Sequence, residues 1–214
     1  MARAGQDLGK YGLRWSHLGF VYRDDSQAPA VWRVVHKLNH CGTADAALYR
    51  QGLGEFFLDN PHRYAAAFVV LAPGLQARLL PLLQDNSRVQ QLDEPRYSMV
   101  AYPWSTQYQK SNQWALETLA LAAAGMGTNT STNTSTASTR AQAQAWLQLQ
   151  RYQPTVLTLS PLARLGARAT SANVAFDDHP NDKRFSDHIE TVTVDSVFAW
   201  LPGAGLGGAA QAVP

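Results

Sequence analysis

Three polar side chains in this sequence could act together as a nucleophile with its base. His17 lies in the aromatic run WSHLGFVY, and His36 lies in the similar run VWRVVHKL. Ser111 opens the run SNQWALETLALAAA, whose apolar spacing predicts a helix. A hydroxyl at the start of a helix lies near unpaired backbone N–H groups, which favour developing negative charge. With one imidazole as base and a second polar side chain to orient it, this hydroxyl would be equipped for covalent acyl transfer.

Each of these residues also has an ordinary structural interpretation. Ser111 is a good N-cap residue, and capping the helix could be its whole role. His17 and His36 could be core histidines whose ring nitrogens are satisfied by neighbouring groups. The sequence alone leaves both interpretations open.

Cys41 is a second candidate nucleophile, because it is the only cysteine in the chain. It follows His40, and either His179 or His188 could serve as a base from later in the sequence. The alternative is a small buried apolar side chain, which is the common environment of a free cysteine. A single cysteine also excludes an internal disulfide framework.

Acidic and histidine side chains gather in a third group, which consists of Asp177, Asp178, His179, Asp182, Asp187 and His188. Divalent metal binding needs three or four such groups to converge on one point. The spacing matches no metal-binding motif, and Pro180 and Asn181 are typical turn residues. We therefore expect a polar loop, with neither a metal ion nor a cofactor.

The elements that must position these residues are a mixture of strands and helices. Residues 15–22 and 31–38 read as neighbouring antiparallel strands, because turn residues separate two aromatic and β-branched runs. Further strands are expected at 68–71, 97–102, 155–159 and 191–194. Because strands and helices do not alternate regularly, the pattern predicts an α+β fold with a mostly antiparallel sheet and packed helices.

Three helices are expected in this pattern. The first begins at Pro73 and is shortened or kinked by Pro81. The second runs over 111–124 with Gly125 as its C-cap. The third runs over 140–151, capped by Ser138 or Thr139.

A chain of 214 residues is long enough for one domain with a real core. We expect a single domain over 1–202. The Thr/Ser/Asn-rich segment 127–139 lacks side chains that could pack a core, so a flexible loop is expected there. The Gly/Ala-rich segment 203–214 is expected to be a flexible tail.

Composition excludes several classes of protein. Charged residues make up 16% of the chain, well below the roughly 25% of an average soluble domain. The net charge is only +2, and the basic residues form no stripe that would indicate nucleic-acid binding. No apolar stretch approaches the roughly 18 residues of a membrane-spanning helix. The first residues also lack the apolar run of an export signal.

Longer segments of the sequence resemble a bacterial family known as domain of unknown function 2145. The segments are ARAGQDL, YGLRWSHLGF, VVHKLNHC, EPRYSMVAYPW, SNQWALE and IETVTVDSVFAWL. The similarity spans nearly the whole chain apart from the Thr/Ser/Asn-rich segment and the tail. It implies an export segment ahead of ARAGQDL, and so a periplasmic or secreted protein, but it implies no specific activity.

The order of His17, His36 and Ser111 also resembles the circularly permuted papain-like superfamily, which includes lecithin retinol acyltransferase-like proteins and permuted cell-wall amidases. This resemblance implies that His17 is the general base, that His36 orients it, and that Ser111 occupies the nucleophile position. The superfamily has Cys at that position. A thiol can attack as a thiolate, whereas a hydroxyl must lose its proton to a base during the attack.

Two functions therefore follow as expectations. The first is a hydrolase or acyltransferase acting on an amide or ester bond in the cell envelope. The second is a non-catalytic module with a degenerate papain-like site, which holds peptidoglycan, a lipid or a peptide.

Overall fold

The computed structural model describes residues 1–26, 28–58, 60–125 and 139–213. Its strands are β1 (Ala2–Ala4), β2 (His17–Leu18), β3 (Phe20–Asp24), β4 (Val31–Asn39), β5 (Ala46–Gly52), β6 (Arg63–Phe68), β7 (Thr155–Thr158), β8 (His188–Thr191) and β9 (Gln211–Val213). Its α-helices are α1 (Pro73–Gln84), α2 (Asn86–Val89), α3 (Ser111–Ala124), α4 (Arg140–Leu149), α5 (Pro161–Thr170), α6 (Asn181–Phe185) and α7 (Val194–Gly203). Two 3₁₀ helices, η1 (Gly9–Tyr11) and η2 (Glu55–Phe57), complete the described elements. Most of the Thr/Ser/Asn-rich segment lies outside the described residues.

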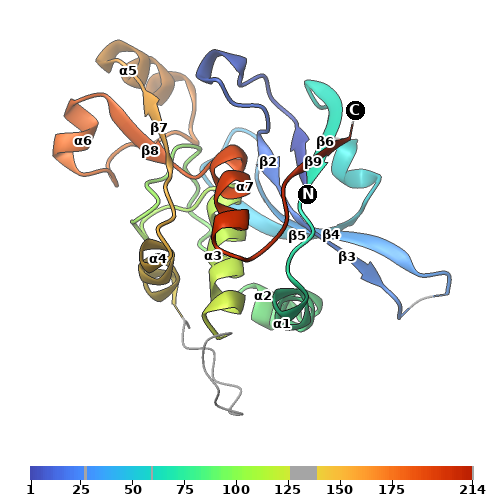
Figure 1. The fold of residues 1–214 in the computed structure, drawn as a ribbon. Coiled ribbons are helices and arrows are strands. Elements are labelled where there is room, and N and C mark those ends of the chain that lie inside the picture. Colours follow the sequence, from blue (N-terminus) through green and yellow to red (C-terminus); the bar gives the residue numbers. More distant parts are fainter. Residues whose placement is uncertain (27, 59, 126–138, 214) are drawn as a thin grey trace.

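The strands form three separate antiparallel sheets. Their strand orders are β2-β1-β6-β9, β3-β4-β5 and β7-β8. This arrangement confirms the expected α+β class and the antiparallel pairing. The strands divide between three sheets packed around a helical centre (Figure 1).

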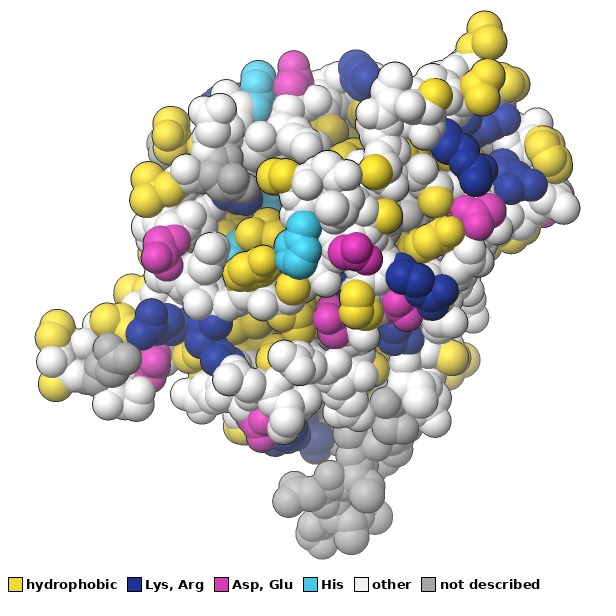
Figure 2. Space-filling model, turned by 180° about the vertical axis from the view of Figure 1, so that it is seen from behind, with side chains coloured by type: hydrophobic (Ala, Val, Ile, Leu, Met, Phe, Trp, Pro, Cys, Tyr) yellow, Lys and Arg dark blue, Asp and Glu magenta, His cyan; other side chains and the backbone are white. Residues whose placement is uncertain are grey.

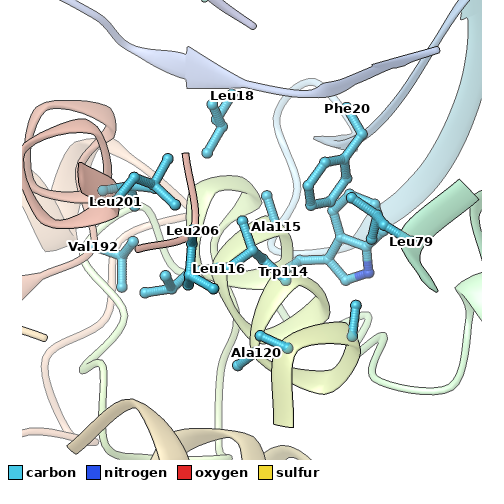
Figure 3. Close-up of a cluster of buried hydrophobic side chains, with 14 of the residues drawn as sticks. Leu18, Phe20, Leu79, Trp114, Ala115, Leu116, Ala120, Val192, Leu201 and Leu206 are labelled. Carbon is cyan, nitrogen blue, oxygen red and sulfur yellow. The ribbon is translucent and has the colours of Figure 1, made fainter. Parts of the chain in front are cut away.

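Helix α3 is the centre of the molecule. All of its residues from Ser111 to Ala123 are buried, and α1, α4, β2 and β4 pack against it (Figure 1). Figure 3 shows Leu18 and Phe20 pointing from their strands toward this helix, where the rings of Phe20 and Trp114 lie 5.8 Å apart. Trp114 is completely buried, and truncating such a side chain to alanine costs about 3–5 kcal/mol. The packing of α3 therefore fixes the start of the helix, at Ser111, firmly against β2.

A buried carboxylate links α3 to α4. Glu117 accepts hydrogen bonds from Arg140, Gln109 and Gln144 at 2.8, 2.6 and 2.7 Å. Helix α4 begins at Arg140, and Thr139 caps it in a reciprocal pair of hydrogen bonds with Gln142. The expected cap at Thr139 is thus confirmed, and the buried ion pair anchors the helix that follows the cap.

The expected continuous strand over 15–22 is wrong. The chain changes sheets at Gly19, so that β2 pairs with β1 whereas β3 pairs with β4. A Cβ atom at Gly19 would lie only 2.8 Å from Val34 Cγ1 and 3.2 Å from His36 Cβ. Only glycine allows the backbone to cross this close to β4. His17 and His36 consequently belong to different sheets, yet they lie side by side.

Three further expectations about strands are wrong. Residues 97–102 are irregular apart from a turn at 99–100, because their polar groups bond to other loops, as when Met99 N donates to Asn173 O. The strand expected at 68–71 ends at Phe68. The strand expected at 191–194 is β8, which ends at Thr191, and Thr193 caps α7.

The Gly/Ala-rich tail also differs from the flexible segment that we expect. Its residues Gln211–Val213 form β9 and pair with β6. Since β1 pairs with the other edge of β6, both ends of the chain lie on one sheet (Figure 1). The composition of the tail conceals this strand, because its order comes from pairing with β6 rather than from its own side chains.

Several expectations are confirmed. Helix α1 begins at the expected Pro73, but the expected interruption at Pro81 is wrong, because the helix continues through Pro81 to Gln84. Helix α3 spans the expected 111–124, with Gly125 as its C-cap, and β7 covers most of 155–159. No helix in the described part of the chain is both long and apolar enough to cross a membrane.

Candidate active site

A chain of hydrogen bonds runs from His17 through His36 to Gln51. The two imidazoles are joined by 2.8 Å between His17 Nε2 and His36 Nδ1, and His36 Nε2 lies 2.8 Å from Gln51 Oε1. The amide oxygen of Gln51 can only accept, so His36 Nε2 carries the proton. His36 Nδ1 must then accept a proton donated by His17 Nε2. This order leaves the lone pair of His17 on Nδ1, which is the form that a general base requires.

The environment of His17 keeps it uncharged at neutral pH. Burial lowers the pKa of His17 well below its usual value, and the charges of His36, Arg3 and Lys110 lower it further. Nδ1 has no hydrogen-bond partner among the described residues. The imidazole is therefore neutral, and it has a free lone pair.

The ring of Phe56 packs against both imidazoles. Its ring centroid lies 5.7 Å from that of His17 and 5.1 Å from that of His36. The guanidinium of Arg3 also contacts Phe56. It lies 5.0 Å from the centroid of the ring and donates a hydrogen bond to Phe56 O. Phe56 is completely buried, so these contacts restrict the rotamers of both histidines.

Asn112 attaches the strand of His17 to the start of α3. Its Oδ1 accepts from Leu18 N at 3.0 Å, and its Nδ2 donates to Ser16 O at 3.3 Å. These two bonds flank His17 in the sequence and join it to the residue after Ser111. His17 and Ser111 accordingly line the same cavity.

Ser111 is not the N-cap of α3. Lys110 occupies that position, and no side chain caps the helix. The interpretation of Ser111 as a capping residue is therefore wrong. Burial raises the pKa of Tyr97, and hydrogen bonds from the side chain and backbone of Ser111 partly offset this rise. Ser111 therefore lies close to Tyr97, and no hydrogen bond joins it to His17 among the described residues.

The cavity that His17 and Ser111 share has a volume of about 550 Å³. None of the described residues that line it is acidic, whereas the basic side chains are those of Arg3, Lys10, Lys37 and Lys110. Lys37 is neutralised by Asp93, whose Oδ1 lies 2.7 Å from the ammonium. Lys10 and Lys110 form no ion pair with a described acidic residue, so their charges make this part of the cavity wall positive.

Helix α5 forms one wall of this cavity through Ala163 and Ala167. No residue of α5 is buried, and Leu162 and Leu165 are 81% and 67% exposed. Figure 2 shows hydrophobic and basic side chains together at the corner where α5 and α6 lie. Because so little surface of α5 is buried, this wall is the least firmly packed part of the cavity.

A second cavity lies on the other side of the α3 start, with a volume of about 860 Å³ and mainly apolar walls. Leu18 and Leu116 line it, whereas their neighbours in the chain, His17 and Ser111–Asn112, line the first cavity. Strand β2 and helix α3 thus separate a polar cavity from an apolar one.

Cys41 lies outside this arrangement. It is exposed on the turn between β4 and β5, so the expectation of a buried apolar side chain is wrong. It is not among the described residues that line either cavity. His179, one of its suggested bases, bonds through both ring nitrogens to Asp178 and to Glu190 O at 2.9 Å each. His188, the other, is exposed on β8.

The acidic group near the C-terminal end of the chain is divided among different partners. Asp177 accepts from Gln107, Asp178 from Tyr102 N, and Asp187 pairs with Arg164. No group of three or more His, Cys, Asp or Glu side chains in the described ranges could hold a metal ion.

Comparison with known proteins places the chain in a family. The model of a family described as an uncharacterized protein conserved in bacteria, DUF2145, matches residues 1–201. The chain belongs to the DUF2145 family. This DUF2145 match includes the whole His17–His36–Gln51 chain and Ser111. No curated protein and no solved structure matches the chain.

Four residues of the site were not identified from the sequence, namely Gln51, Phe56, Lys110 and Asn112. Gln51 reaches His36 diagonally across β4 and β5, where His36 pairs with Tyr49 and Val34 pairs with Gln51. The contact between Gln51 and His36 can be predicted only if the register of β4 and β5 is known beforehand. Asn112 and Lys110 flank Ser111 in the sequence. Their position at the start of the predicted helix was the feature that could have identified them as site residues.

Proposed function

We propose that this protein is a hydrolase or acyltransferase that acts on an amide or ester bond, with Ser111 as nucleophile and His17 as general base. The observation that carries the proposal is the hydrogen-bond chain from Gln51 to His17, which leaves a basic nitrogen in the cavity of Ser111. The ring nitrogens of a purely structural buried histidine usually have hydrogen-bond partners, whereas His17 Nδ1 has none among the described residues.

The reaction begins when Ser111 turns its hydroxyl from Tyr97 toward the substrate. The oxygen attacks the carbonyl carbon while His17 Nδ1 takes the proton, and His36 orients the imidazolium that forms. His17 then returns the proton to the leaving amine or alcohol, which departs and leaves an acyl group on Ser111.

Water or a second alcohol or amine completes the cycle. It attacks the acyl carbon and gives its proton to His17; the bond between the acyl carbon and Ser111 Oγ then breaks, and His17 returns the proton to Oγ. Water makes the protein a hydrolase, and another acceptor makes it an acyltransferase. The order of base, orienting residue and nucleophile supports a relation to the permuted papain-like superfamily, and the resemblance of the sequence to exported proteins supports a substrate in the cell envelope.

Hydrolysis of an activated ester, such as 4-nitrophenyl acetate, tests the chemistry. The full chain should release a burst of about one equivalent of nitrophenol, because the acyl-enzyme accumulates. Ser111→Ala should abolish the burst, and His17→Gln should reduce its rate by about 10² to 10⁴. Ser105→Ala is the matched control, since Ser105 lies outside the cavity lining, and it should keep the burst. A burst that survives in Ser111→Ala would show that Ser111 is not the nucleophile.

A non-catalytic binding module is the second candidate, and the closeness of Ser111 to Tyr97 favours it. In that case the hydroxyl is a structural group. Tyr97→Phe distinguishes the two, because releasing Ser111 should preserve or increase the burst of an enzyme. The variant Ser111→Cys should gain thiol reactivity without turnover if the site has lost its chemistry. Iodoacetamide labelling of Cys41 that stopped turnover would favour the second arrangement instead.

A further inference from the structure

Lys110 is a buried cation beside the proposed nucleophile. Its side chain is only 9% exposed and lines the cavity of Ser111. Its ammonium has no hydrogen-bond or ion-pair partner among the described residues, in contrast to that of the buried Lys37, which bonds to Asp93, Glu94 O and Gln109. Burial alone lowers the pKa of Lys110 to about 8, so the ammonium is still mainly charged at neutral pH. A buried charge without a counterion costs free energy and is retained where a ligand supplies the counterion.

The start of α3 adds a second attraction for an anion at the same place. The helix has 14 residues, Lys110 is its N-cap, and no side chain caps it. Its first N–H groups and its dipole therefore favour a negative group in front of Ser111 and Asn112. Lys110 and the helix start act on the same volume, because Lys110, Ser111 and Asn112 all line the cavity.

Among the residues that the structure describes, the rest of the cavity lining provides no negative charge to compete with such a ligand. Its described lining holds no Asp or Glu. Arg3, which is 4% exposed, adds a further positive charge near His17. Apolar residues such as Leu157, Val174 and Phe176 form other parts of the wall, so the cavity also suits an uncharged remainder of the ligand.

We propose that the cavity binds its substrate through a carboxylate or phosphate group, with Lys110 and the N-terminus of α3 as the anion subsite. That the bound anion is part of a substrate rests on the proposed function, whereas anion binding itself does not require the chemistry of Ser111. The chain would therefore act on an amide or ester that carries an acidic group close to the bond to be cleaved.

Titration of the full chain with acetate and, separately, with inorganic phosphate tests this subsite. Binding is followed by the amide ¹H–¹⁵N NMR signals of Asn112 and Gln113, with sodium chloride keeping the ionic strength constant. Both signals should shift with a saturable dependence on one anion or on both. The anion with the higher affinity identifies the acidic group of the substrate as a carboxylate or a phosphate.

Three variants assign the site. Lys110→Gln should weaken binding by at least about tenfold, because a charge-assisted hydrogen bond is lost. Lys110→Arg retains the charge and should stay within about threefold of the original affinity. Lys10→Gln removes a more exposed cation from the same cavity and should change binding less than about twofold.

The outcomes separate this inference from the proposed function. Ser111→Ala should lose the ester burst and keep anion binding, so a missing burst with intact anion binding counts against the chemistry only. Absence of saturable shifts with both anions would overturn the anion subsite. Equal weakening in Lys10→Gln and Lys110→Gln would overturn the assignment to Lys110, because it would indicate a diffuse attraction.

Discussion

The imidazoles of His17 and His36 are joined by a 2.8 Å hydrogen bond although they belong to different sheets. Their ring planes are inclined by 70°, and Phe56 packs against both. Because His36 also bonds to Gln51, the position of each proton in the pair is determined by an amide oxygen on a third strand. The basicity of His17 therefore depends on a residue that does not touch it.

Gln51 should accordingly control the rate of acylation. Gln51→Leu removes the acceptor, so His36 can adopt the other tautomer and present a proton toward His17. The rate of the ester burst should fall by about tenfold to a hundredfold, part of what general-base catalysis contributes. Gln51→Glu keeps an acceptor at the same place and should retain more activity than Gln51→Leu. Equal rates in all three proteins would show that the amide does not orient the pair.

Gly19 should be intolerant of a side chain. Gly19→Ala places a Cβ atom 2.8 Å from Val34 Cγ1, and the resulting overpacking should cost about 1–3 kcal/mol in the free energy of unfolding. Urea denaturation measures this cost. Gly54→Ala is the matched control, because a Cβ atom there meets nothing within 4 Å. The same loss in both variants would argue against a tight crossing at Gly19.

The same glycine shows how far the sequence could predict this fold. Helix α3 was predictable in full, since a segment rich in Ala and Leu ends at a glycine. The break between β2 and β3 was not, because pairing to two different sheets depends on contacts with β1 and β4 that are distant in sequence. Local residue types predict elements well, but they do not specify which strands pair.

The candidate site divides in the same way. The residue types of His17, His36 and Ser111 indicated acyl transfer, and the structure brings the two histidines together and places His17 in the cavity of Ser111. Gln51 could not be predicted, because it depends on the register of β4 and β5. Cys41 was indicated by being unique, yet its turn lies outside the cavity lining.

The stability of the protein should fall as the pH drops below about 6.5 because of His17. Its pKa is lowered in the folded state, so between the folded and unfolded values the unfolded chain binds more protons. Stability from this group is present above pH 6.5 and is lost as the pH falls toward the folded pKa. Thermal unfolding between pH 5 and pH 7.5 should show a smaller decline in His17→Phe than in the original protein. An identical decline would exclude His17 as the titrating group.

Lys110 should lower stability at neutral pH. Since burial lowers its pKa from 10.5 to about 8, removing the charge with Lys110→Met should raise the free energy of unfolding by up to about 3 kcal/mol at pH 7. The unfolded state binds more protons between pH 8 and 10.5, so the original protein gains stability over that range and the variant should lack this gain. Urea denaturation across this pH range measures both effects. A variant less stable than the original would contradict an unpaired buried charge.

The pair of Glu117 and Arg140 should be essential for folding. Glu117→Leu leaves the Arg140 guanidinium without its carboxylate in a buried position, which should cost about 3–5 kcal/mol. Glu117→Leu combined with Arg140→Met should recover part of this loss, because no unpaired charge remains. Denaturation of the three variants measures the coupling. Equal losses of stability in the single and the double variant would show that the unpaired charge of Arg140 does not cause the loss.

Covalent labelling by a fluorophosphonate most directly tests whether Ser111 is a nucleophile activated by His17. Labelled protein is digested, and mass spectrometry locates the modified residue. The proposal predicts one label on Ser111, slower labelling by about 10² or more in His17→Gln, and none in Ser111→Ala. A folded protein that stays unlabelled at Ser111, or that labels equally fast without the imidazole of His17, would contradict the proposed chemistry.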